Sequence, residues 1–120
     1  MITHLKFAGV ACRDQAAALK FWTEKVGFRV VTDQPMGEQR WIELAIHNSQ
    51  TGLVLFTPEG HEDRIGTFFN GSFACDDVEH AYRKLVEKGV EFEGPPQKQP
   101  WGTFAIFKDP EGNEFVLGSR

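Results

Sequence analysis

The feature that most constrains the fold is an internal repeat. When the sequence is shifted by 63 positions against itself, six residues in a short window meet an identical partner: Ala11 with Ala74, Cys12 with Cys75, Asp14 with Asp77, Ala18 with Ala81, Glu24 with Glu87 and Lys25 with Lys88. These identities fall at matching places in two similar hydrophobic patterns, which indicates a tandem duplication. A chain of 120 residues amounts to one domain, so we expect the two copies to be its halves.

Each copy predicts the same order of elements: a strand, a helix and three further strands. In the first copy an apolar strand at 5–12 leads to Asp14, a residue typical of helix N-caps. In the second copy Asp76 and Asp77 offer the cap, and a glycine ends the helical pattern in both copies. The remaining strands are expected at about 28–33, 40–46, 52–57, 70–75, 90–93, 101–108 and 113–118.

The predicted elements divide the chain into a first module of about residues 1–57, a polar connector at 58–69 and a second module of about 70–120. This pattern predicts an α+β fold, in which two tandem βαβββ modules form a curved, half-open barrel of mixed sheet. Helices would cover the convex side and leave a cavity on the concave side. We therefore expect a single domain spanning residues 1–120.

Strand alternation selects the residues that should line this cavity. Successive side chains of a strand point to opposite faces, so the residues between helix-facing positions should point inward. These residues are Phe7, Trp41, Glu43, Leu53, Leu55 and Thr57 in the first module, and Asn70, Ser72, Phe104, Ile106, Glu114 and Val116 in the second. A slip of one residue would exchange the two faces of a strand.

The last strand follows a recognisable turn in FKDPEGNEFVLG, residues 107–118. Proline presets the first turning residue and glycine tolerates a positive φ, so this segment predicts a tight turn between two strands. In the strand after the turn, Val116 is the middle residue of the inward face.

Three segments carry a resemblance to a known family: FAGVACRDQAAALKFWTEKVGF, FACDDVEHAYRKLVEKGV and FKDPEGNEFVL. Together they resemble the vicinal oxygen chelate superfamily, which contains glyoxalase I, extradiol dioxygenases, fosfomycin-resistance enzymes and bleomycin-binding resistance proteins. The likeness covers essentially the whole chain, and it implies the two-module fold and a homodimer. It does not select one activity, because this fold supports several chemistries.

The resemblance also implies where a metal would bind. Metal-dependent members take His or Glu from the first strand of each module, and His or a carboxylate from the last strand. The corresponding positions here are Phe7, Leu55, Asn70 and Val116. Phenylalanine, leucine and valine have no donor atom, and one asparagine does not make a site. We therefore predict no metal and no cofactor.

Charge and hydropathy narrow the class of partner. The formal net charge is −4, and the Lys and Arg residues are scattered rather than gathered in a basic stripe. This pattern argues against nucleic acid or an acidic membrane surface as partner and favours a small molecule. Because no long apolar segment is found, we expect a cytoplasmic protein.

Two ligand-directed functions remain open at this point, beside a third in which the cavity is collapsed and the chain is a structural or regulatory interaction module. In the first, a metal-independent protein binds a small hydrophobic or aromatic molecule among Phe7, Trp41, Leu55, Asn70, Phe104, Ile106 and Val116, with His61 of the connector folded over the cavity mouth. In the second, the chain is a metal-dependent or Glu-based lyase, isomerase or dioxygenase. Glu43 is then the candidate general acid or base, because enclosure by Trp41 and Leu55 would favour its protonated form.

Overall fold

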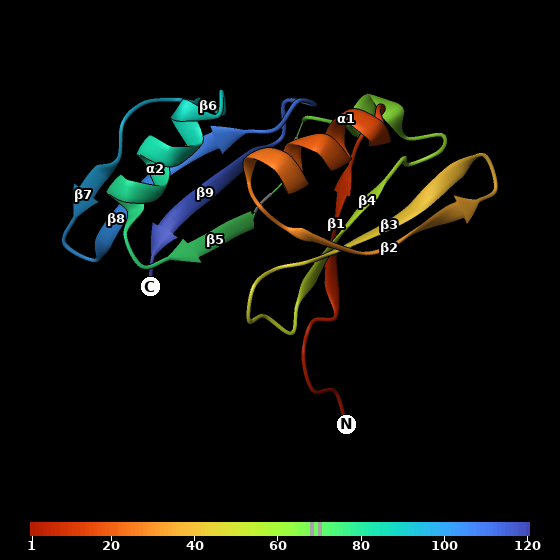
Figure 1. Cartoon of the computed structure of the whole chain (residues 1–120), viewed down its shortest axis with the longest axis horizontal. Helices are drawn as coiled ribbons and strands as arrows, with labels where there is room; N and C mark the ends of the chain where they lie inside the picture. Colours follow the sequence, from red (N-terminus) through yellow and green to blue (C-terminus); the bar gives the residue numbers. More distant parts are fainter. Residues whose placement is uncertain (68, 70) are drawn as a thin grey trace. The chain divides into compact units, whose positions relative to one another are not determined.

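The computed structural model describes residues 1–67, 69 and 71–120, which form two compact units, Met1–Ile65 and Gly66–Arg120. Each unit contains one mixed sheet and one α-helix (Figure 1). In the described part of the chain the two sheets share no strand pairing. Asn70, one of the predicted site residues, lies outside the described residues.

The first unit contains a four-stranded sheet in the order β1-β4-β3-β2. β1 runs parallel to β4, and the other neighbours are antiparallel. The elements are β1 (Phe7–Ala11), α1 (Gln15–Lys20), the π-helical turn η1 (Phe21–Lys25), β2 (Arg29–Met36), β3 (Gln39–Ala45), β4 (Gly52–Phe56) and the 3-10 helix η2 (Glu62–Arg64).

The second unit repeats this arrangement in the order β5-β9-β8-β6, with β7 also paired to β8. Its elements are β5 (Gly71–Cys75), α2 (Val78–Glu87), β6 (Glu91–Phe92), β7 (Gln97–Gln99), β8 (Gly102–Lys108) and β9 (Glu114–Ser119). The predicted α+β fold with two βαβββ units is confirmed. The short strand β7 was not predicted, because its three residues follow two prolines and are all exposed.

Aspartate caps begin both helices, as the sequence predicts. The carboxylate of Asp14 accepts a hydrogen bond from the backbone N–H of Ala17 at 3.0 Å, and that of Asp77 accepts one from His80 at 3.1 Å. Each bond satisfies a backbone donor that the first helical turn leaves free. Asp76 instead pairs with Arg120 at 2.8 Å. The two caps therefore stand at equivalent places of the repeat.

One face of each sheet is buried under its helix. In the first unit the fully buried side chains include Val10, Ile42, Leu44 and Leu55 of the sheet, with Trp22 of η1. In the second unit the rings of Phe107 and Phe115 are buried and stack with their centroids 5.3 Å apart. The opposite faces are only partly covered, and they carry most of the predicted site residues.

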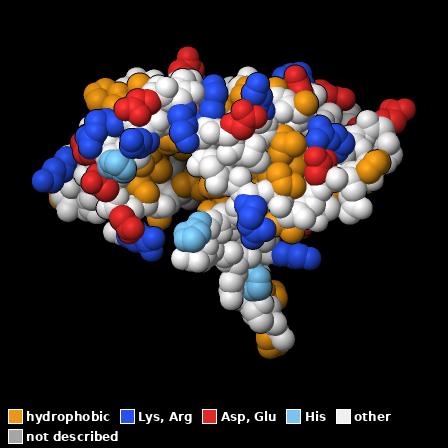
Figure 2. Space-filling view, in the orientation of Figure 1, with side chains coloured by type: hydrophobic (Ala, Val, Ile, Leu, Met, Phe, Trp, Pro, Cys, Tyr) orange, Lys and Arg blue, Asp and Glu red, His pale blue; other side chains and the backbone are white. Residues whose placement is uncertain are grey.

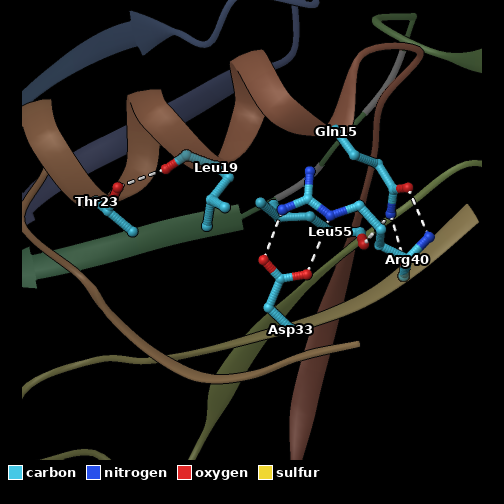
Figure 3. Close-up of polar contacts among 6 residues, drawn as sticks. All are labelled: Gln15, Leu19, Thr23, Asp33, Arg40 and Leu55. Carbon is cyan, nitrogen blue, oxygen red and sulfur yellow. Dashed lines mark hydrogen bonds and ion pairs between the residues drawn. The ribbon is translucent and has the colours of Figure 1, made fainter. Parts of the chain in front are cut away.

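A buried glutamine joins α1 to its sheet (Figure 3). The side chain of Gln15 is 9% exposed, and its Nε2 donates to the carbonyl oxygens of Arg40 at 2.7 Å and Leu55 at 3.0 Å. Its Oε1 accepts from the backbone N–H of Arg40 at 3.0 Å. Because buried polar groups need partners, these three bonds hold the start of α1 over β3 and β4.

The exterior carries charges of both signs. Figure 2 shows acidic and basic side chains interspersed over the visible surface. Of the described helices, neither α1 nor α2 has the length and apolar character needed to cross a bilayer.

We expect Gln15→Leu to lower the free energy of unfolding by about 3 kcal/mol, because it leaves buried backbone groups of β3 and β4 without partners. The matched control is Asp33→Asn, which weakens the exposed ion pair between Asp33 on β2 and Arg40 on β3 (Figure 3). This control should cost less than about 1 kcal/mol. Urea unfolding of the wild type and of both variants measures the three free energies of unfolding. Equal decreases in Gln15→Leu and Asp33→Asn would contradict the assigned role of Gln15.

Candidate functional site

The register of β3 and β4 corrects the predicted face of Leu55, and also that of Leu53, which pairs with the buried Leu44. Glu43 pairs with Val54, whereas Leu55 pairs with Ile42. Paired residues of neighbouring strands share a face, so Leu55 belongs to the buried face under α1. The prediction that Leu55 lines the same face as Trp41 and Glu43 is therefore wrong by one residue, and Val54 takes that place.

The uncovered face of the first sheet is aromatic. The rings of Phe7 and Trp41 meet edge to face, with centroids 5.6 Å apart, and both residues are partly exposed. The ring of Phe56 lies over Gly9, where an added Cβ would stand 2.9 Å from Phe56 Cε1. A glycine at this position therefore lets an aromatic ring lie close to the strand.

Glu43 occupies this aromatic face as predicted, next to Trp41 along β3. Its expected enclosure by Leu55 does not occur, because Leu55 points to the other side of the sheet. Glu43 pairs with Thr32 on β2 and is partly exposed. The catalytic role of Glu43 stays a prediction.

The uncovered face of the second sheet carries Phe104, Ile106 and Val116. Val116 pairs with Ser72 on one side and Ile106 on the other, so the three apolar residues share one face, as alternation predicts. They are partly exposed, whereas the opposite face is closed by buried phenylalanines. Whether they contact a ligand stays a prediction.

Trp101 extends this second face beyond what the sequence predicts. Its side chain is 71% exposed, and its ring stacks on Phe104 with centroids 5.5 Å apart and planes at 21°. A large exposed ring held parallel to a second ring forms a flat apolar surface. The only signal in the sequence was a tryptophan beside a proline-rich turn, which does not reveal its partner.

One end of the second face is charged. Lys108 pairs with Glu114 across β8 and β9, and Glu93 lies beside them. The hydrogen bond with the Glu114 carboxyl group raises the pKa of Glu93, and repulsion between the two carboxylates adds to the shift. The positive charge of Lys108 lowers the pKa of Glu93. Lys108 and Glu114 also line a hollow of about 440 Å³ with Thr67 and Phe69.

The turn that starts β9 is held by two buried polar residues. Asp109 Oδ1 accepts from the backbone N–H groups of Glu111 and Asn113, at 3.0 and 2.9 Å, and Oδ2 accepts from Asn113 Nδ2 at 3.0 Å. Asn113 Oδ1 in turn accepts from Gly66 N at 3.2 Å. Burial raises the pKa of Asp109, although these hydrogen bonds act against the shift. The turn thereby sets the register that directs Val116 to the uncovered face.

Asn70, one of the four positions where the family resemblance would place metal ligands, lies outside the described residues, and the other three do not fit a divalent cation. Gly9 pairs with Val54 as Ser72 pairs with Val116, and Gly9 and Ser72 are equivalent in the repeat, so Val54 is the counterpart of Val116. The side chains of Phe7, Val54 and Val116 contain only carbon and hydrogen and cannot coordinate a metal. Across residues 1–67, 69 and 71–120, no three His, Cys, Asp or Glu side chains gather into a candidate metal site.

His61 is exposed at the start of η2, in the connector between the sheets. Arg13 Nη2 donates to the carbonyl oxygen of Glu62 at 2.8 Å, and Ile65 is only 5% exposed, so this part of the connector is attached to the first unit. The predicted ligand contact of His61 stays a prediction.

The comparisons with known proteins define the class of this chain. Residues 2–117 match the family model of the Glyoxalase/Bleomycin resistance protein/Dioxygenase superfamily. The chain belongs to this superfamily.

Relatives of similar length support this assignment. The Bacillus subtilis (strain 168) protein YetH is 40% identical over 121 residues, covering 98% of each chain. The crystal structure of TnmS3, an antibiotic binding protein from Streptomyces sp. CB03234, is 35% identical with a TM-score of 0.88, covering 98% of this chain and 96% of that one. A superfamily member from Sphaerobacter thermophilus is 32% identical with a TM-score of 0.87, covering 99% and 98%.

We expect Glu114→Gln to lower the pKa of Glu93 toward the ordinary glutamate value of about 4.3, because the variant removes a carboxylate charge beside it. NMR titration of the side-chain carboxyl carbons measures this pKa. Glu91→Gln is the control, since Glu91 lies 4.0 Å from Lys108 but does not raise the pKa of Glu93. A Glu93 pKa that is the same in wild type and Glu114→Gln would contradict the pairing.

The raised pKa of Glu93 determines how this residue's contribution to folding stability changes with pH. The folded pKa of Glu93 lies above the unfolded value, so the folded chain keeps this proton to a higher pH. The contribution to stability is therefore fully present below the unfolded pKa and is lost as the pH rises through the folded pKa.

Proposed function

We propose that the chain is a metal-independent binding protein of this superfamily, which holds a small hydrophobic or aromatic molecule against its uncovered sheet faces. The observation that carries the proposal is the stacked pair of Trp101 and Phe104, which continues into Ile106 and Val116. The antibiotic-binding role stated for TnmS3 supports the same class of function.

The energetics favour such a ligand. Covering apolar surface gains roughly 25 cal/mol for each Å² removed from water, and a flat ring also gains stacking contacts with Trp101. Phe7 and Trp41 offer a second aromatic surface in the first unit. We propose ligand binding for each of the two faces separately, so each face is tested with an alanine variant of its own.

Metal independence is part of the proposal, because the hydrocarbon side chains of Phe7, Val54 and Val116 occupy three of the four positions considered for ligands, and Asn70 alone does not make a site. No contact among the described residues singles out Glu43 as an acid or base. Its role, and the lyase, isomerase or dioxygenase alternative, stay predictions. A homodimer and a cytoplasmic location stay predictions as well.

We expect a screen of planar polycyclic compounds, followed by thermal shift and tryptophan fluorescence, to find ligands that stabilise the wild-type protein. Trp101→Ala should weaken binding about ten-fold or more, because it removes a ring from the apolar surface. Trp101→Phe is the matched control and should retain most of the affinity, since it preserves an aromatic face. Circular dichroism confirms that each variant is folded.

Trp41→Ala provides the corresponding test for the first unit. Loss of affinity in this variant alone would assign the ligand to the Phe7–Trp41 surface, and loss in Trp101→Ala alone would assign it to the second face. The binding proposal fails when no compound stabilises the wild type, or when neither alanine variant changes the affinity of a compound that does.

We expect calorimetric titration of metal-stripped protein with nickel, zinc, manganese and ferrous ions to show no tight one-to-one binding, because the family positions provide no adequate donor set. The titration is independent of the ligand screen. Tight stoichiometric binding of any of these ions would overturn metal independence and favour the metalloenzyme alternative.

A further inference from the structure

A second hollow lies in the first unit, where β2 begins and β3 ends. Its volume is about 370 Å³, and the residues around it include Arg29, Ala45, His47, Asn48 and Ser49. Arg29 pairs with Ala45, which alternates along β3 with Glu43 and Trp41. Arg29 therefore belongs to the edge of the uncovered aromatic face of this sheet.

The charge in this hollow is positive, although the chain as a whole is acidic. No Asp or Glu is among the described residues that line it. Within the part of the chain that the structure describes, Arg29 forms no ion pair with a carboxylate, unlike Arg40, which is bound to Asp33. An exposed guanidinium without an acidic partner retains its hydrogen-bond donors for a ligand.

The turn beside Arg29 is held in place by local hydrogen bonds. Ser49 N donates to the carbonyl oxygen of Ile46 at 3.0 Å, and Asn48 adopts a positive φ of 58°. The Ser49 hydroxyl accepts from Thr51 N at 3.1 Å and donates to Thr51 O at 3.0 Å. Thr51 Oγ1 donates to Leu5 O at 2.6 Å, so the turn is attached to the segment before β1. Preorganised groups lose less conformational freedom on binding.

We propose that this hollow binds an oxyanion, the phosphate or carboxylate group of a small molecule, with Arg29 as the main contact. The planar guanidinium matches the geometry of two anionic oxygens and donates to both. The His47 ring and the Asn48 amide supply further donors from the fixed turn. This site does not depend on the proposed binding of aromatic compounds, because an inorganic anion alone is enough to test it.

The experiment is a two-dimensional ¹H–¹⁵N NMR titration with sodium phosphate, in which sodium chloride keeps the ionic strength constant. Saturable shifts are expected at the Arg29 side-chain N–H and at the backbone amides of His47 and Asn48. Arg29→Gln should weaken binding about five-fold or more, as expected for loss of an exposed charge-assisted contact. Arg83→Gln on α2 is the control, because it changes the net charge equally at a distant position in the sequence and should leave the affinity unchanged.

Sodium acetate, titrated in the same way, distinguishes a carboxylate site from a phosphate site. Saturation with either anion at these resonances supports the proposal, and the tighter anion identifies the group that is preferred. Linear, non-saturating shifts with both anions would overturn it, as would equal weakening in Arg29→Gln and Arg83→Gln. If no aromatic compound binds but the phosphate titration saturates, the proposed function is wrong and the oxyanion site is still supported.

Discussion

The parallel pairing of the first and last strand in each unit is the constraint on which the rest depends. β1 pairs with β4, and β5 pairs with β9, in the same direction. Parallel neighbours cannot be joined by a tight turn, so the chain between them must cross over, and here it includes a helix. The helix covers one face of the sheet, and the other face is only partly covered. The candidate ligand surfaces are these uncovered faces.

The two copies share this framework but differ at the ends of their uncovered faces. Val54 and Val116 occupy equivalent central positions, and both are apolar. In the first unit the face ends at Arg29, beside a turn that carries no acid. In the second it ends at Glu114, whose carboxyl group is hydrogen-bonded to Glu93 and which pairs with Lys108 across β8 and β9. The two units therefore share an apolar centre, whereas Arg29 is at the edge of the first face and Glu93, Glu114 and Lys108 are at the edge of the second.

The accuracy of the sequence predictions follows the strength of the local signals. Asp14 and Asp77 are caps in the structure, because capping depends on residues only three positions apart. The face of Val116 was predicted correctly, since the preceding turn sets the phase of β9. The face of Leu55 was wrong because Leu53, Val54 and Leu55 are all buried and all apolar. A strand without polar residues gives no alternation from which its phase can be read.

The sequence by itself determined the repeat, the order of the elements except β7, the superfamily and the lack of donor atoms at Phe7 and Val116. Each of these depends on residue identity or on short spacings. Only the tertiary structure decided that Val54 shares a face with Glu43, that Trp101 stacks on Phe104 and that Arg29 lies beside the turn at His47. These contacts are set by strand register and turn geometry, which depend on packing between whole elements and not on any local preference of the residues that meet.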